Sequence, residues 1–231
     1  MRFAFDNLFF FGMALVILGS AFVGFARSYY LAGVFKAPLP NLLVHIIRGG
    51  VFSCWILLLI VQTSLVAAGR VDVHRRLGPL GFALACLVVL LGPLVATDQQ
   101  VRHFAPGEAA IRVRAFFMIT LSTMLAFGTL IYFASRNRFN PAAHKRLILI
   151  AAIAILDAAF QRWRVPVAWW GERAAALTCT VPLLLLIVSS DYWSTGAVHR
   201  ATIWASALVV GLQQLRDPLG IPPPGRLSPH G

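Results

Sequence analysis

Long apolar runs recur along the whole chain, and they constrain its fold more than any other feature. A helix that crosses a bilayer core of about 30 Å needs about 20 mostly apolar residues, because it rises about 1.5 Å per residue. Seven runs come close to that length, at residues 8–26, 44–68, 77–96, 115–134, 142–160, 174–190 and 198–215. They lack the alternating pattern of membrane barrel strands. We therefore predict an all-α, polytopic transmembrane helical bundle of about seven spans, with a range of six to eight.

Composition agrees with a fold that lies within a membrane. The chain has 231 residues, of which 59% are hydrophobic and only 12% are charged, whereas an average globular protein has about 25% charged residues. This excludes a soluble single domain, and the apolar content excludes a disordered chain. We assign residues 1–215 to the bundle. Residues 216–231 contain five prolines and no apolar periodicity, which predicts a disordered tail.

The first apolar run also has features of a signal peptide. Gly24 and Ala26 are small residues at the positions that a signal peptidase would require. However, the basic leader is a single Arg2 offset by Asp6, and the apolar stretch is long for a signal peptide. We predict an uncleaved membrane span here.

Positive charge dominates the polar residues. Lysine and arginine number 20 against 8 aspartate and glutamate, a formal net charge of +12. The cations stand in short clusters beside apolar runs, such as Arg75 and Arg76, or Arg136, Arg138, Lys145 and Arg146. This placement favours the lipid bilayer and its anionic phospholipid headgroups as partners, and not nucleic acid. The cations divide almost equally between the two faces, so they give no orientation. The oligomeric state stays open, and a homo-oligomer is one option.

Histidines followed by a cation open three alternate runs. His74 opens the third run, His144 the fifth and His199 the seventh. Because successive spans reverse direction, these three histidines share one face of the membrane. The loops into the third and fifth runs are similar to each other. In the second of these loops, Asn140 suits a helix cap and Pro141 suits the first helical position.

The histidine motifs resemble those of a group of uncharacterised bacterial multi-pass membrane proteins. The resemblance rests on residues 69–78, Gly-Arg-x3-His-Arg-Arg-Leu-Gly, and on residues 140–147, Asn-Pro-x2-His-Lys-Arg-Leu. It covers roughly residues 42–165 and implies a shared architecture in the bacterial cytoplasmic membrane. More distantly, the placement of histidines on several spans is similar to cytochrome b561-type helical bundles, in which histidines on neighbouring helices ligate haem from both sides.

These observations lead to a haem hypothesis. His74 and His144 lie on one face of parallel helices, and neutral imidazole is a normal axial ligand of haem iron. His45 and His103 would form a second site on the opposite face and complete an electron path across the membrane. The candidate ligands of b-type haem are therefore His74, His144, His45 and His103. The haem propionates would be neutralised by nearby cations, namely Arg75, Arg76, Lys145 or Arg146.

Other interpretations stay open. A histidine beside a cation at a helix start also suits an interfacial residue that bonds to a lipid phosphate or a loop carbonyl. His74, His144 and His199 could together hold zinc, although the His-Glu-x-x-His spacing is absent. Asp157 is the acid farthest inside a run, and it is either a proton or cation site or half of an interfacial ion pair with Arg164.

Motifs of soluble enzymes are missing from the sequence, which has no Walker loop, no Gly-x-Ser-x-Gly elbow and no dinucleotide fingerprint. The sequence assigns no enzymatic activity. Two functional classes stay open. One is a redox protein that ligates haem or passes electrons to quinone, and the other is a cofactor-free membrane protein that transports or acts as a scaffold.

Overall fold

The structure is a computed structural model that describes residues 2–36, 42–102 and 108–220. These residues form helices and connecting turns, with no strand among them, which confirms the all-α prediction. The helices are α1 (Arg2–Phe25), the π-helical turn η1 (Ala26–Tyr30), α2 (Leu42–Ala67), α3 (Val71–Arg102), α4 (Glu108–Arg136), α5 (Pro141–Ile155), α6 (Asp157–Phe160), α7 (Arg164–Thr195) and α8 (Arg200–Gly220).

Among the residues that the structure describes, five helices are long and apolar enough to cross a membrane, which indicates a multi-pass membrane protein. The candidate spans are Leu8–Tyr30, Gly49–Ala67, Val71–Asp98, Arg114–Arg136 and Leu177–Thr195. The expected spans at residues 142–160 and 198–215 are not among them. The first of these is divided between the 15-residue α5 and the short α6. The second coincides with α8, whose apolar stretch contains Gln213 and Gln214.

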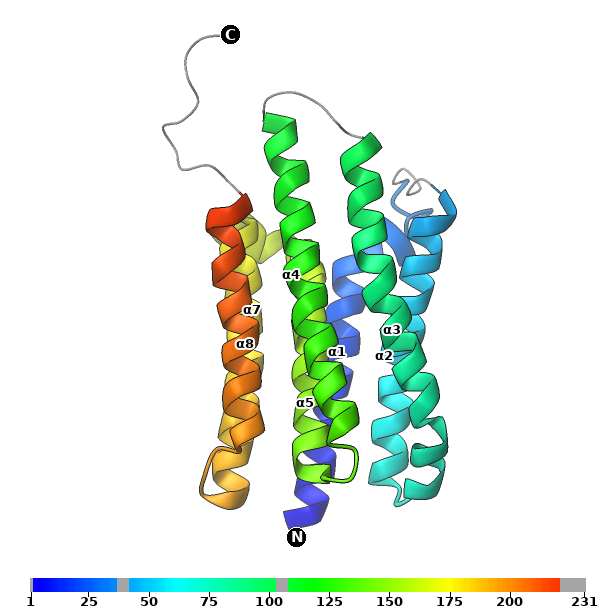
Figure 1. The fold of residues 1–231 in the computed structure, drawn as a ribbon, viewed down its shortest axis with the longest axis vertical. Coiled ribbons are helices and arrows are strands. Elements are labelled where there is room, and N and C mark those ends of the chain that lie inside the picture. The colour runs from blue at the N-terminus through cyan, green and yellow to red at the C-terminus, as the bar shows by residue number, and fades with distance from the viewer. Residues whose placement is uncertain (1, 37–41, 103–107, 221–231) are drawn as a thin grey trace.

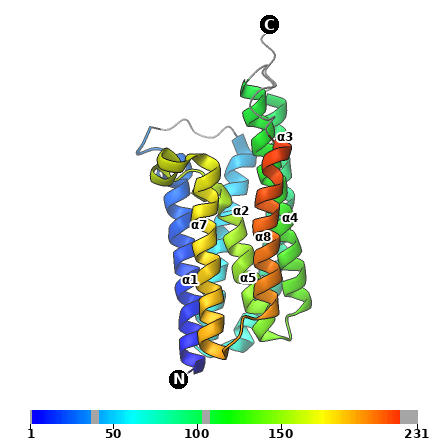
Figure 2. The same cartoon turned by 90° about the vertical axis from the view of Figure 1, so that its left-hand side faces the viewer.

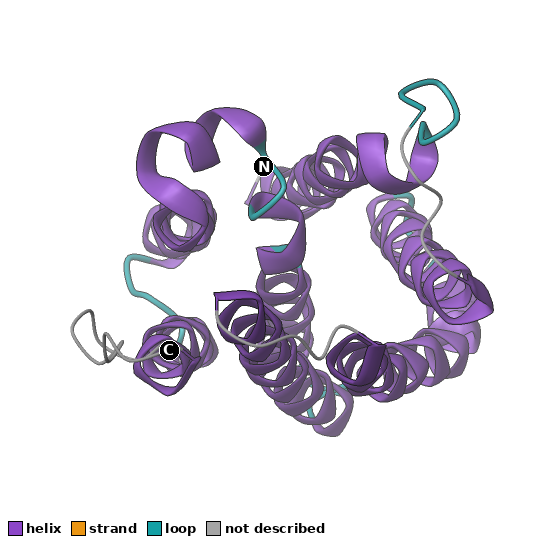
Figure 3. Ribbon diagram, turned by 90° about the horizontal axis from the view of Figure 1, so that it is seen from above, coloured by secondary structure: helices purple, strands orange, loops and turns teal. Residues whose placement is uncertain are grey.

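The long helices stand nearly parallel, with the connecting turns at the two ends of the molecule (Figures 1 and 2). Seen from above, most of them appear end-on (Figure 3). α5 is central, because it packs against α1, α4, α6, α7 and α8. Every residue from 149 to 157 is buried. Neighbouring helices therefore cover α5, so protein and not lipid surrounds most of this short apolar helix.

The start of α5 is fixed by the predicted cap. The Ala143 N–H donates to Asn140 Oδ1 at 3.3 Å, and Pro141 occupies the first turn. This satisfies one of the donors that a helix start leaves free, and proline has no N–H to satisfy there. The prediction for Asn140 and Pro141 is confirmed.

α1 contacts the junction between α5 and α6 at a glycine. A Cβ atom added to Gly24 would lie 2.7 Å from both the Cβ and the carbonyl oxygen of Ala159. Only a residue without a side chain fits this approach of two backbones. The small size of Gly24, which also suits a signal peptidase site, thus has a packing role in the fold.

Helix α8 continues to Gly220. The first five residues of the segment expected to be a disordered tail, 216–220, are therefore helical. The rest of the expected tail, 221–231, lies outside the described residues.

Candidate functional site

His74 and His144 occupy equivalent positions in two helices. The backbone N–H of His74, in the first turn of α3, donates to the carbonyl of Arg70 at 3.1 Å. That of His144, in the first turn of α5, donates to the carbonyl of Asn140 at 2.9 Å. Both helices begin at the end of the molecule that holds the N-terminus (Figure 1). The similarity of the two loops in sequence is matched by the same helix-start geometry.

The two imidazoles lie next to each other. Their ring centroids are 6.4 Å apart, and the ring planes cross at 78°. Both side chains are half-buried. Two histidines that only reached toward separate lipid phosphates would have no reason to converge from two helices on one point.

The two rings differ in their hydrogen bonds. His144 Nδ1 lies 2.8 Å from the carbonyl oxygen of Ala134, so this nitrogen carries the proton and Nε2 carries the lone pair. His74 Nδ1 is buried and has no hydrogen-bond partner among the described residues. His144 has the arrangement of histidines that ligate metals, in which one nitrogen is held by a hydrogen bond and the other carries the lone pair.

The cations beside the two histidines divide into two groups. Arg75 and Arg76, which follow His74, are exposed at the surface. Lys145 forms an ion pair with Asp6 of α1 and lies 4.6 Å from the centroid of the Phe10 ring. Arg146 also pairs with an acid, as shown below. Of the four cations proposed as partners for propionates, only Arg75 and Arg76 face solvent.

Asp191 of α7 is the centre of a buried polar network that the sequence analysis missed. Its Oδ1 accepts from Arg146 Nε at 2.7 Å and from Nη2 at 2.6 Å. Its Oδ2 accepts from the Thr202 hydroxyl at 2.5 Å and from the His199 backbone N–H at 3.2 Å. The Asp191 side chain is 2% exposed. The network joins α5, α7 and the start of α8.

A signal for Asp191 was present in the sequence. The predicted sixth span ended at residue 190, one position before it, and only Asp157 was considered as an acid inside a span. The turn from α7 to α8 is short, so Asp191 must lie on the same face as His199 and therefore as Arg146. Pairing acids with cations on the same face of the membrane would therefore have predicted the contact between Asp191 and Arg146.

His199 has a local structural role. Its Nδ1 accepts from the backbone N–H of Ala201 at 3.1 Å. Across the described part of the chain, no group of three or more His, Cys, Asp or Glu side chains is placed to hold a metal ion. The alternative in which His74, His144 and His199 bind zinc together is therefore wrong, because His199 is held by its own helix start.

Asp157 is fully buried at the start of α6. Its Oδ2 accepts from the Thr123 hydroxyl of α4 at 3.3 Å. The side chain of Arg164, its expected partner, lies outside the described part of the structure, as does that of His45 in α2. His103 lies in the segment between α3 and α4 that is not described, so the second haem site stays a prediction.

No protein family model, curated protein or solved structure matches this chain. The resemblance of its motifs to bacterial membrane proteins therefore stays a prediction.

Proposed function

We propose that this chain binds a b-type haem between His74 and His144 as a multi-pass protein of the bacterial cytoplasmic membrane. The observation that carries the proposal is the pair of converging imidazoles. A metal ion lies about 2 Å from a ligating imidazole nitrogen. Two imidazoles that shared one ion would therefore have centroids roughly 6 Å apart, and the observed separation is 6.4 Å.

The surroundings of the two rings support ligation. The Ala134 carbonyl holds Nδ1 of His144, which fixes the orientation of that ring and raises the basicity of its Nε2. The buried Nδ1 of His74 has no partner among the described residues, and such an atom is costly unless something binds it. Arg75 and Arg76 are exposed near His74 and can pair with propionates. Haem supplies one-electron chemistry when bound, and these residues hold and orient it.

About seven spans fit the proposed membrane topology. α5 and α6 together cover residues 141–160, which is about 30 Å of helix rise and matches the bilayer core. α8 adds a second short span beside α4 and α5. Together with the five segments that are long and apolar enough to cross a membrane, we propose seven spans. The motif resemblance supports the assignment to a bacterial membrane.

The absorption spectrum of the purified protein tests the haem proposal. We expect a Soret band from protein that is expressed with ample haem and purified in detergent. His74→Ala and His144→Ala should each lose most of this band while still eluting as a single species. His199→Ala is the matched control, since its Nδ1 accepts from the Ala201 N–H of its own helix start, and it should keep the band.

The alternative is a cofactor-free protein that transports or acts as a scaffold. That alternative predicts imidazoles that point apart into the headgroup region. Wild-type protein that is folded, supplied with haem and still without a Soret band would favour it and overturn the haem proposal.

A further inference from the structure

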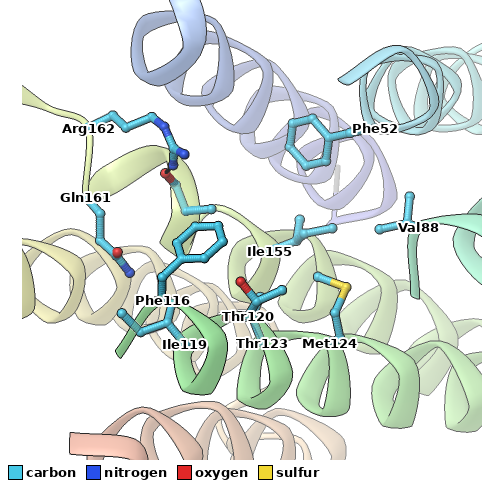
Figure 4. Close-up of a pocket in the computed structure, with 11 residues that line it drawn as sticks. Phe52, Val88, Phe116, Ile119, Thr120, Thr123, Met124, Ile155, Gln161 and Arg162 are labelled. Atoms are coloured by element: carbon cyan, nitrogen blue, oxygen red, sulfur yellow. Dashed lines mark hydrogen bonds between the residues drawn. The ribbon is translucent and has the colours of Figure 1, made fainter. Parts of the chain in front are cut away.

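A cavity of about 280 Å³ lies between α2, α3, α4 and the junction of α5 with α6 (Figure 4). Its walls are mainly apolar, with Phe52 from α2, Phe116 and Met124 from α4, and Ile155 from α5. Ile155 follows His144 by 11 residues along α5, a rise of about 16 Å. The cavity is therefore separate from the histidine pair.

One end of the cavity is polar and offers hydrogen-bond donors. Gln161 Nε2 is buried and has no hydrogen-bond partner among the described residues. Arg162 lies beside it, where its Nη1 donates to the carbonyl of Ala158 and its Cζ lies 4.9 Å from the centroid of the Phe25 ring. A guanidinium has five N–H donors and no acceptor, so it can serve more than one acceptor at once. A ligand that satisfies this end must bring acceptor atoms.

The charge near the cavity favours a neutral ligand over an anion. Thr123, which lines the cavity, donates its hydroxyl to the buried carboxylate of Asp157. A buried carboxylate therefore lies behind the Thr123 part of the wall. A ligand carboxylate beside Thr123 would meet Asp157 as a like charge. A carbonyl oxygen accepts from the same donors without that repulsion.

The size and walls of the cavity favour a single flat ring. Ligand pockets commonly measure about 300 to 1,000 Å³, so this one suits a head group and leaves no room for a long tail. Phe52 and Phe116 both face it and can pack against a ring (Figure 4). An apolar tail would extend from the cavity into lipid.

We infer that the cavity between α4 and the α5–α6 junction binds the head group of a membrane quinone, with a ring carbonyl accepting hydrogen bonds from Gln161 and Arg162. Quinones combine a neutral flat ring, carbonyl acceptors and an apolar tail. The inference rests on this cavity alone and does not require haem at His74 and His144.

Direct binding of decylubiquinone, a short-tailed quinone, to the detergent-purified full chain tests this inference. We expect saturable binding by titration calorimetry with a stoichiometry of one. A hydrogen bond contributes about 0.5–1.5 kcal/mol, so Gln161→Leu and Arg162→Gln should each weaken binding about three- to tenfold. Ala158→Leu should weaken it further by filling the cavity. An azido derivative of the quinone should label peptides from α4 or the segment after α6.

Two matched variants control for the substitutions themselves. Gln213→Leu removes another buried amide, which bonds to Thr180 in α7 and lies outside the cavity. Arg138→Gln removes another arginine that covers an aromatic ring, since its Cζ lies 4.8 Å from the centroid of the Phe139 ring. Both variants should bind the quinone as the wild type does.

Three results would overturn the inference. They are no saturable binding to folded wild-type protein, equal binding by Gln161→Leu and wild type, and displacement of the quinone by an equal concentration of decanoate, which would assign the site to carboxylates. His74→Ala protein, which lacks the proposed haem ligand, should still bind the quinone. Failure of the haem proposal and failure of this one are therefore separate outcomes.

Discussion

At the scale of single residues, the buried carboxylate of Asp191 holds together side chains and backbone from three helices and the turn before α8. It holds Arg146 by two hydrogen bonds and also accepts from Thr202 and the His199 backbone. We predict that Asp191→Asn lowers the free energy of unfolding by about 3–5 kcal/mol, because it leaves a buried guanidinium without its counter-charge. Thermal or denaturant unfolding in detergent measures this loss.

An exposed acid provides the control for Asp191. Asp72 lies 4.0 Å from Arg70, and both side chains are 65% exposed. Asp72→Asn should change the stability by less than about 1 kcal/mol. Replacing both buried partners, as in Arg146→Met with Asp191→Leu, should cost less than Asp191→Asn alone, since no charge is left unpaired. Equal losses from Asp191→Asn and Asp72→Asn would contradict the assigned role.

His199 should make stability depend on pH. Burial lowers the pKa of this imidazole, with a further lowering from Arg146 and Lys145 and an opposing effect of Asp191. The folded state therefore takes up a proton less readily than the unfolded state. The stability that neutral His199 contributes to the fold is fully present above the pKa of the unfolded state, about 6.5. This stability is lost as the pH falls toward and through the lower pKa of the folded state.

We therefore predict that the melting temperature falls between pH 7.5 and pH 5, and that His199→Asn reduces this fall. Asparagine can still accept from the backbone N–H of Ala201 through its side-chain oxygen, but it does not titrate. Melting curves at several pH values measure the difference. The same slope in both proteins would show that other groups cause the pH dependence.

At the scale of helices, the contact between Gly24 of α1 and Ala159 of α6 leaves no room for a side chain. Gly24→Ala should destabilise the protein by about 1–3 kcal/mol, because two backbones must separate. Gly12 and Gly19 lie in the same helix, and a Cβ there would meet nothing within 4 Å. Alanine at either should change the stability by less than about 0.5 kcal/mol. Melting temperatures of the three variants, measured together, test the contact.

Much of the helix pattern could be predicted from the sequence, because apolar length alone marks a membrane span. The cap at Asn140 was also predictable, since its side chain acts within its own turn. The break at Leu156 was not. Neither glycine nor proline stands there, and the break coincides with the approach of Gly24 to Ala159, which depends on a helix more than 130 residues earlier in the chain.

At the scale of the whole molecule, the parity of the spans predicted that His74 and His144 share one end, and the structure brings their rings together. The cavity beside Gln161 was not predicted. It is built by residues from five helices and the segment after α6, and their spacing in the sequence carries no common motif. A site that tertiary packing assembles from several helices has no short sequence motif. A site at a helix start does have one, as the two His-cation motifs show.

Haem binding should stabilise the entire bundle if the proposed function holds. A ligand that binds only the folded state raises stability with its concentration, and His74 and His144 join α3 to α5, which do not belong to one hairpin. We predict that haem-loaded wild-type protein melts at a higher temperature than its haem-free form. The double variant His74→Ala/His144→Ala should show no difference between the two preparations. An equal shift in the variant would indicate nonspecific association.

The pairing of two adjacent cations in α5 has a consequence for biogenesis. Lys145 binds Asp6 in α1, whereas Arg146 binds Asp191, which follows it by 45 residues. While the ribosome is still making that later stretch, α5 has neutralised only one of its two charges. Until Asp191 has been made, the Arg146 guanidinium lacks the counter-charge that it has in the finished fold. The final packing of α5 therefore depends on α7, which follows it in the chain.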